Sequence, residues 1–425
     1  MSVPNARNRS AIILLLTANA ISGVAQGISL IAIPWYFTTR AEGSLYAVLY
    51  AAVTLVSLVW GPYSGTLVDR YSRKHIFLVL NGVCAVILFG VAAIGYSRGE
   101  LPWWWVGSVF LMTFMNFNIH YPNLYALMQE ITPPAQYGRI TSILEVSNQT
   151  TSVLSGAAAA LLLEGTTGGA FRIFGASLDI GYDVAAWQIH DIFLLDGSTY
   201  VVSLLIISAM RYTPILTKSV ETGPLLQRLR TGWRYLVEHG RLFVFGVASY
   251  VVFAAVLMTT FYLAAPYVED HLGESGDIFA SAEMYYAIGA IAAGLLVRIL
   301  LRGVRLTPSI TGMTLLAASV YLTLMLTRSL AVTFAMFFLI GICNAGIRIQ
   351  RVTFLFQHLP NEVYGRAGSI FFVSNVIIRS VFLLIFALPF FHRDGHIVYT
   401  FGMIGGLLLA AAGVLWWNDR RNTVS

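Results

Sequence analysis

Charged residues are scarce in this chain of 425 residues. Asp, Glu, Lys and Arg together make up 11% of it, whereas hydrophobic residues make up 57%. A soluble globular domain has about 25% charged residues, so this composition excludes a water-exposed surface over most of the chain. The polar residues that do occur inside apolar segments therefore have to be interpreted one by one.

Cysteine and the common catalytic motifs are also rare or missing. Cys84 and Cys343 each lie within an apolar run, which argues against a disulfide framework and against a zinc site. The sequence has no HExxH motif, no glycine-rich phosphate loop and no clustered acidic pair. We therefore expect a protein that is not an enzyme, with no catalytic residue, no cofactor, no bound metal and no nucleic-acid partner.

Long apolar runs, in contrast, are abundant. About 20 apolar residues cross the core of a bilayer as a helix. On that criterion the sequence predicts an all-α membrane protein with twelve transmembrane helices, at approximately 11–38, 45–68, 75–96, 102–130, 139–163, 191–211, 242–266, 277–301, 308–327, 330–356, 366–390 and 395–417.

Basic residues predict the orientation of these helices. Most of the Lys and Arg residues fall in connections on the same side as the two termini, and the connections of the opposite side contain Arg40, Arg98, Arg172, Arg328 and Arg393. Cytoplasmic loops carry an excess of Lys and Arg. The pattern predicts a multi-pass protein of the cell (inner) membrane with both termini in the cytoplasm.

An internal repeat indicates two related halves. Residues 116–148 and 344–375, aligned with a single one-residue gap, are identical at thirteen positions, which include Tyr-Gly-Arg and Val-Ser-Asn. The segment 212–241 between the halves is polar and basic, and its apolar residues recur at the spacing of an amphipathic surface helix. We expect two pseudo-symmetric six-helix bundles, at 1–211 and 242–425, joined by a cytoplasmic linker at 212–241.

The connection after the second span has a recognisable pattern. Residues 61–74 read GPYSGTLVDRYSRK, and Gly61 and Gly65 share one helix face. This segment resembles the signature loop of the major facilitator superfamily, although Ser72 stands where that family has a second glycine. The residues that we assign to this cytoplasmic gate motif are Gly61, Gly65, Asp69, Arg70, Arg73, Lys74 and Glu130.

The resemblance implies a secondary transporter in which Asp69 helps to hold the halves together on the cytoplasmic side. Asp69 would then contact the start of the eleventh span, near Gly365, and Arg73 would pair with Glu130. A simpler interpretation is that the basic residues only anchor the loop at the membrane surface.

The twelve-span layout, the gate motif and the PWYF run at 34–37 resemble the drug/proton antiporter branch, which includes macrolide efflux pumps and siderophore exporters. The chain departs from this branch in the fifth span, which lacks a Gly-Pro pair. The resemblance implies proton-coupled efflux of a small amphipathic or anionic molecule by a monomer in the lipid bilayer. A membrane-embedded lipid-modifying enzyme and a non-transporting sensor of the same fold are the alternatives.

Several polar residues fall inside the predicted spans, where they normally face a bundle interior or a water-filled cavity. We expect Glu145 to respond to protons, and Arg379 and Arg348 to attract a negatively charged substrate. Alternatively, Arg348 pairs with Glu145 as a structural latch, and Arg351 reaches the cytoplasmic face. The full set of candidates for the substrate and ion cavity is Glu145, Arg379, Arg348, Arg351, His120, Asn148, Asn375 and Glu283.

Overall fold

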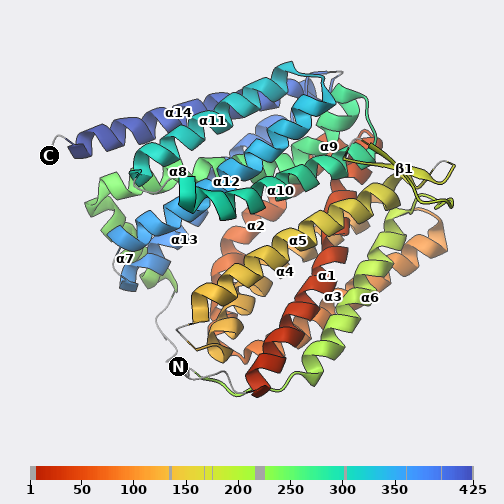
Figure 1. Ribbon diagram of the computed structural model, residues 1–425, viewed down its shortest axis with the longest axis horizontal. Coiled ribbons are helices and arrows are strands. Elements are labelled where there is room, and N and C mark those ends of the chain that lie inside the picture. Colours follow the sequence, from red (N-terminus) through yellow and green to blue (C-terminus); the bar gives the residue numbers. More distant parts are fainter. Residues whose placement is uncertain are drawn as a thin grey trace. The chain divides into compact units, whose positions relative to one another are not determined.

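The computed structural model describes residues 6–133, 136–166, 168–174, 176–215, 225–300, 304–359, 361–393 and 395–423 (Figure 1). Nearly all of these residues are helical, which confirms the predicted all-α membrane fold. The long helices are α1 (Ala6–Thr39), α2 (Gly43–Arg70), α3 (Arg73–Arg98), α4 (Trp103–Ile131), α5 (Tyr137–Glu164), α6 (Ile189–Ala209), α8 (Gly240–Met258), α10 (Gly276–Leu300), α11 (Leu306–Leu326), α12 (Leu330–His358), α13 (Asn361–Phe386) and α14 (Val398–Thr423).

Each of the predicted spans coincides with one of these long helices. Within the described residues, ten helical segments are long and apolar enough to cross a membrane. Helices α4 and α5 are outside this set, although they contain 29 and 28 residues. Both carry amide or other polar side chains in their middle, such as Asn116 in α4 and Asn148 in α5. Length therefore identifies these two spans better than hydropathy does.

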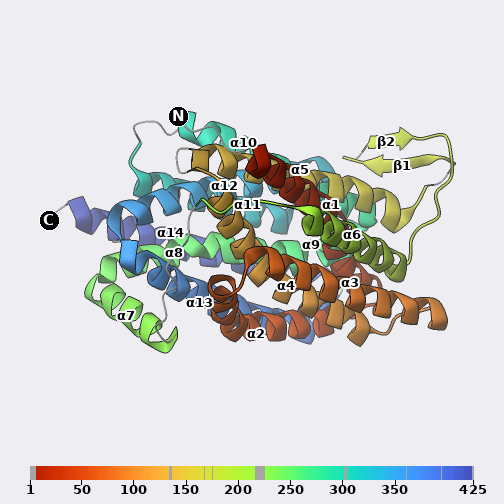
Figure 2. The same ribbon diagram turned by 90° about the horizontal axis from the view of Figure 1, so that it is seen from below.

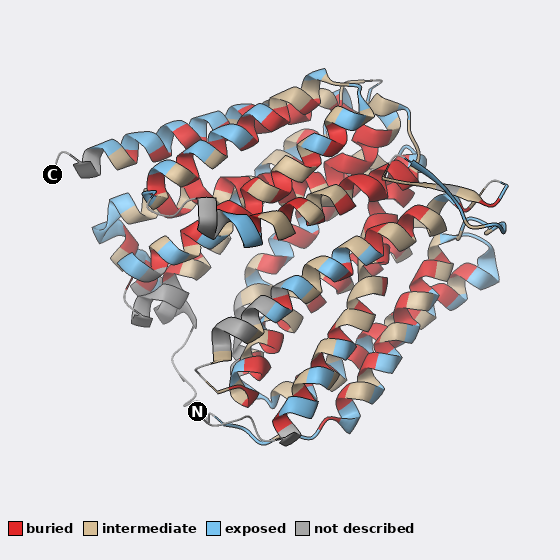
Figure 3. Cartoon of the chain, in the orientation of Figure 1, coloured by how far each residue is buried: buried red, intermediate tan, exposed pale blue. Residues whose placement is uncertain are grey.

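The outward-facing sides of the helices, opposite the protein interior, are apolar. Buried and exposed residues alternate along α14 with the helical period (Figure 3). Large exposed side chains elsewhere are also apolar, and Val86 and Leu326 are 72% and 81% exposed. Exposed apolar surface on this scale indicates contact with lipid rather than with water.

The predicted amphipathic linker helix is present as α7 (Leu225–Glu238). Figure 2 shows α7 beside the end of α13. Leu236 is buried, whereas Trp233 is about half exposed and contacts the ring of Phe243 at the start of α8. The helix therefore has one face packed on the protein and one free face, as an interfacial helix requires.

The helical segment that begins with α8 extends past Met258, the last residue of α8. It continues through η2 (Thr259–Leu263), α9 (Ala264–Pro266) and η3 (Tyr267–Leu272), of which η2 and η3 are π-helical. Gly273 then closes the segment with a left-handed conformation, φ +68°. Pro266 has no N–H to offer, and π-helical turns are often found at functional sites. This widened segment places Tyr262 and Tyr267 in the interior.

The long connection between α5 and α6 contains two short strands, β1 (Ala170–Ile173) and β2 (Ala176–Asp179). They form a two-stranded sheet, which Figure 2 shows as a ribbon beyond the helix ends. This hairpin is an addition to the predicted all-α architecture.

The described residues group into two compact units. Unit 1 comprises residues within 1–37, 56–171 and 178–222, and unit 2 comprises residues within 38–55, 172–177 and 223–425. The first half of α2 and the tip of the hairpin thus belong to unit 2.

Candidate functional site

Arg379 is a buried cation in unit 2. It lies on α13, and the residue is 4% exposed. Its guanidinium lies 5.5 Å from the centre of the Tyr50 ring, and Tyr50 donates a hydrogen bond to Leu257 O at 3.1 Å. Among the described residues, Nε of Arg379 has no hydrogen-bond partner and the guanidinium has no ion pair with a carboxylate. Nε of this arginine is therefore available as a donor for a further group.

Arg351 is buried as well, but it is tied to the protein. It donates a hydrogen bond to Ser249 O at 2.9 Å, and its guanidinium lies 3.6 Å from the centre of the Tyr250 ring. Asn375 of α13 donates to Tyr250 O at 3.3 Å. The alternative that Arg351 reaches the cytoplasmic face is therefore wrong, because α8 supplies a carbonyl and an aromatic ring that bind the buried guanidinium. The expected role of Arg351 in a substrate cavity stays a prediction.

Arg348 and Glu283 lie near the contact between α10 and α12. Asn344, one turn before Arg348, donates to the hydroxyl of Tyr286 at 2.8 Å. Arg348 and Glu283 both act electrostatically on this tyrosine, and Glu283 forms a side-chain hydrogen bond with Thr260 in η2. The alternative pairing of Arg348 with Glu145 stays a prediction, because the side chain of Glu145 lies outside the described part of the chain.

Unit 1 has a neutral polar cluster of its own. Nε2 of His120 on α4 lies 2.9 Å from Oδ1 of Asn19 on α1, and Asn19 donates to Oδ1 of Asn148 on α5 at 3.2 Å. Glu145 precedes Asn148 by three residues on α5, so both positions share a helix face. Three of the predicted cavity residues, His120, Asn148 and Glu145, thus occupy neighbouring positions on two helices.

The gate motif joins the start of α3 to the ends of α4 and α6. Arg73 forms an ion pair with Glu130, and Asn123 donates to Arg73 O at 2.9 Å. Lys74 donates to Ser208 O and Met210 O at 2.8 and 2.7 Å. The expected contact between Arg73 and Glu130 is present, whereas its role in a gate stays a prediction.

Gly61 and Arg70, two further members of the motif, contact residues close to them in sequence. Ser64 donates to Gly61 O at 2.6 Å, and Arg70 lies 5.9 Å from the ring centre of Tyr71. Gly65 and Asp69 lie on α2, but their side-chain surroundings are outside the described part of the chain. The expected contact of Asp69 with the eleventh span therefore stays a prediction.

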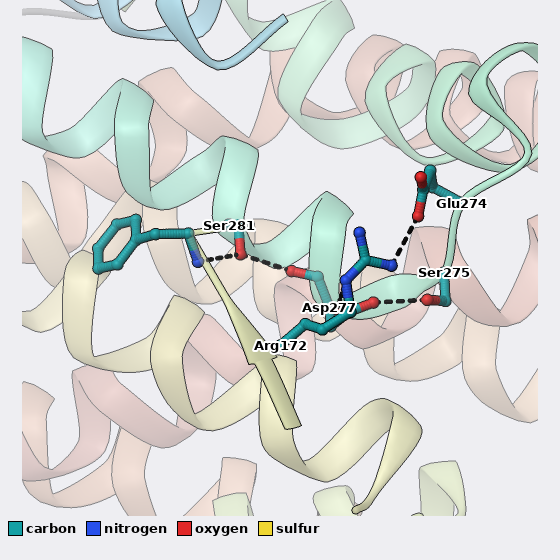
Figure 4. Close-up of polar contacts among 6 residues, drawn as sticks. Arg172, Glu274, Ser275, Asp277 and Ser281 are labelled. Carbon is teal, nitrogen blue, oxygen red and sulfur yellow. Dashed lines mark hydrogen bonds and ion pairs between the residues drawn. The ribbon is translucent and has the colours of Figure 1, made fainter. Parts of the chain in front are cut away.

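The hairpin tip is fastened to α10 within unit 2 (Figure 4). Arg172 pairs with Glu274 at 2.8 Å and lies 3.8 Å from Asp277, while the N–H of Phe174 donates to Oγ of Ser281 at 3.0 Å. The Phe174 ring contacts Tyr285 edge-on at 5.2 Å. An apolar cavity of about 590 Å³ lies beside this contact, lined by Phe174, Tyr285, Ile288, Leu330, Ala331, Phe334, Ala335 and Phe338.

One buried acid was not predicted from the sequence. Asp196 on α6 is completely buried in unit 1 and accepts a hydrogen bond from Ser29 on α1 at 2.8 Å. Its signal in the sequence is an aspartate within a predicted span, in the segment FLLDGSTYVV.

The family model of the Major Facilitator Superfamily matches residues 15–383. The chain belongs to the Major Facilitator Superfamily. This confirms the resemblance that the gate motif and the span pattern indicate. This superfamily is one of multi-pass membrane transporters, which agrees with the ten candidate spans among the described residues.

Solved structures of Major Facilitator Superfamily type share the fold at low sequence identity. A bacterial homologue of the human lysosomal transporter Spinster, in an inward-facing and unoccupied conformation, has a TM-score of 0.72 and 12% identity over 98% of each chain. The D-xylose-proton symporter has a TM-score of 0.72 and 13% identity over 97% of this chain and 98% of its own. The nucleoside transporter NupG has a TM-score of 0.70 and 11% identity over 96% of this chain and 99% of its own. These likenesses show the fold alone.

A shorter match connects this superfamily member to an efflux protein. The multidrug efflux pump Tap of Mycobacterium tuberculosis is 26% identical over 93 residues, and the same match occurs in Tap of Mycobacterium bovis. The match spans 22% of this chain and 22% of those relatives.

Proposed function

We propose that this transporter exports a small anionic or amphipathic molecule from the cell in exchange for protons. It would act as a monomer in the inner membrane, with both termini in the cytoplasm. Two six-helix bundles at 1–211 and 242–425, with the linker 212–241 between them, would alternate access to the substrate. The observation that carries the proposal is the buried Arg379, whose guanidinium has no carboxylate partner among the described residues.

A buried arginine of this kind needs a compensating interaction. An Arg at the centre of a transmembrane helix costs at least about 2.5 kcal/mol on insertion scales. The face of the Tyr50 ring offsets part of that cost. A planar guanidinium binds carboxylates and phosphates through two parallel hydrogen bonds, so an anionic group of the substrate is the partner that fits best. Arg348 on α12 would add a second positive charge.

Glu145 is the proposed proton-binding partner. It lies three residues from Asn148, which belongs to the hydrogen-bonded cluster with Asn19 and His120. A protonated Glu145 is neutral, so it would compete less with the anionic substrate for positive charge. A deprotonated Glu145 would compete again and help to expel the anion. This exchange would couple the movement of the proton to that of the anion.

The direction of transport is supported by the match to Tap, which is named as a multidrug efflux pump. The match covers a minor part of both chains, so it favours export without identifying a substrate. Asp69 and the Arg73–Glu130 pair would close the cytoplasmic side of the transporter.

Liposomes that contain the purified protein test this proposal. A pH-sensitive dye inside them reports proton movement when anionic, zwitterionic and cationic amphipathic compounds are added separately. We expect anionic compounds to drive proton movement in the wild-type protein. In R379A the KM for these compounds should rise about 10- to 100-fold, because a charge-assisted hydrogen bond contributes about 1.5–3 kcal/mol.

R393A is the matched control, because Arg393 is exposed in the connection between α13 and α14. It should leave the KM unchanged. Transport that does not depend on the pH gradient, or an R379A variant with the wild-type KM, would overturn the proposal.

A further inference from the structure

Asp196 is buried at a junction of helices in unit 1 without an ion-pair partner. Its Oδ2 accepts the hydrogen bond from Ser29 Oγ, and its Oδ1 has no hydrogen-bond partner among the described residues. None of the ion pairs between described residues includes it. The carboxyl group is therefore completely removed from solvent with only one of its oxygens satisfied.

A connected set of polar side chains surrounds this carboxyl group. Tyr200 follows Asp196 by one turn, and its hydroxyl accepts hydrogen bonds from Gln26 on α1 and Asn116 on α4, both at 3.0 Å. Cys84 on α3 faces both Asp196 and Tyr200. The hydroxyl of Tyr200 thus accepts two hydrogen bonds and also interacts with the side chain of Cys84. Four helices thus contribute polar groups to one buried cluster.

The titratable groups around Asp196 include no lysine or arginine in the described part of unit 1. Cys84 comes from α3, Tyr200 from α6 itself and Tyr121, which acts on Tyr200, from α4. Helix α1 contributes the neutral Ser29 and Gln26. A positive charge that would stabilise an ionised carboxylate is absent from this set.

Further titratable groups lie between the cluster and the exposed end of α6. His190 is six residues from Asp196, about 9 Å along the helix axis. The hydroxyl of Tyr96 on α3 donates a hydrogen bond to Asp191, which is partly exposed. The ring centre of Tyr96 lies 4.6 Å from that of His190. Gly95 permits this close approach, because a Cβ there would lie 2.4 Å from Cβ of His190. The seam between α3 and α6 therefore has titratable groups at its exposed end, less than two helical turns from Asp196.

We propose that Asp196 is a second proton-binding site of the transporter, in addition to Glu145, and exchanges its proton along the seam between α3 and α6. An isolated carboxylate ion in an apolar interior is far more costly than the neutral acid, and protonation removes the charge that no neighbour compensates. This inference rests on the proposed proton coupling and assigns part of it to unit 1.

In a purely structural role, Asp196 would only join α6 to α1 and would not need to exchange a proton. The hydrogen bond from Ser29 ties α6 to α1, and an asparagine oxygen could accept that bond equally well. Asparagine cannot exchange a proton, however. D196N therefore keeps the connection between the helices and removes only the titration.

Infrared difference spectra of the detergent-solubilised full chain, recorded between acidic and alkaline pH, test the titration directly. We expect a protonated-carboxyl band that is lost in D196N and retained in E100Q, because Glu100 is exposed. S29A keeps the carboxyl group, and it should move the pH midpoint of the band by about one unit, since a hydrogen bond to a charged group contributes about 1.5–3 kcal/mol. An unchanged spectrum in both D196N and S29A would overturn the proposal.

Transport by the same variants separates this inference from the proposed function. In proteoliposomes, D196N should lose about tenfold or more of the accumulation driven by a pH gradient, while counterflow of an anionic substrate persists. If the wild type responds to the gradient and D196N responds equally, the inference fails and the proposed function stands. If the wild type does not respond to the gradient, the proposed function fails, and the infrared band alone decides whether Asp196 binds a proton.

Discussion

At the scale of single residues, Arg73 and Glu130 illustrate how burial changes the value of an ion pair. Their side chains are 17% and 12% exposed, and the side chain of Asn123 on α4 donates a hydrogen bond to the backbone carbonyl of Arg73 on α3. Arg305 and Asp419 form a second ion pair, at 3.1 Å, in which the Arg305 side chain is 60% exposed. Water screens the second pair far more than the first.

A double-mutant cycle with R73A and E130A should therefore give a coupling free energy of about 1–3 kcal/mol. The same cycle with R305A and D419A should give less than about 0.5 kcal/mol. Equilibrium unfolding in mixed micelles measures both. Additive effects of R73A and E130A would show that the pair at the gate motif contributes no stability of its own.

Some contacts between single residues could be predicted from the sequence, and others could not. The pairing of Arg73 with Glu130 was predictable because the resemblance of residues 61–74 to the superfamily signature implied it. Asp196 was not, because Ser29 and Cys84, which lie beside it, come from α1 and α3, two helices that are distant in sequence. A single aspartate in an apolar run gives no indication of which side chains the tertiary fold will bring to it.

At the scale of helices and strands, the length of the apolar runs predicted the spans, and the helical spacing of apolar residues predicted α7. The hairpin β1–β2 was missed because its strands contain only four residues each and their stability depends on contacts of the tip with α10. The π-helical widening after α8 was missed as well, since it depends on how the interior packs rather than on local propensity.

The contact between α10 and α12 depends on two glycines. A Cβ at Gly289 would lie 2.0 Å from Phe338 O, and a Cβ at Gly341 would lie 2.1 Å from Tyr286 O. Both obstacles are backbone atoms, which cannot move aside as a side chain can. The two helices therefore pack backbone against backbone, as small residues allow in membranes.

G289A should consequently destabilise the protein by about 1–3 kcal/mol, because the added methyl group forces α10 and α12 apart. G294A on the same helix is the control, since a Cβ there meets no atom within 4 Å. Replacing that glycine should be neutral or slightly stabilising. Thermal unfolding in detergent measures both variants, and equal melting temperatures would contradict the close packing of these helices.

At the scale of the whole molecule, the distribution of positive charge predicts how the chain is threaded through the membrane. The net charge is +6, and basic residues flank α7, with Arg234 within it and Arg241 at the start of α8. The connection between α3 and α4, in contrast, is residues 99–102, which are GELP, and the basic residue beside it is Arg98 at the end of α3. Positive residues are retained on the cytoplasmic side during insertion, so α7 should face the cytoplasm and the α3–α4 connection the outside.

Single cysteines at two exposed glutamates test this threading. Cys84 and Cys343 are buried, and both are replaced by alanine to give an unreactive background. Glu100→Cys should then react with a membrane-impermeant maleimide in intact cells, because the α3–α4 connection is predicted to lie outside. Glu238→Cys, at the end of α7, should react only after the cells are opened. The reverse pattern would place both termini outside, would invert the direction assigned to the gate motif and would put the exposed end of the α3–α6 seam in the cytoplasm.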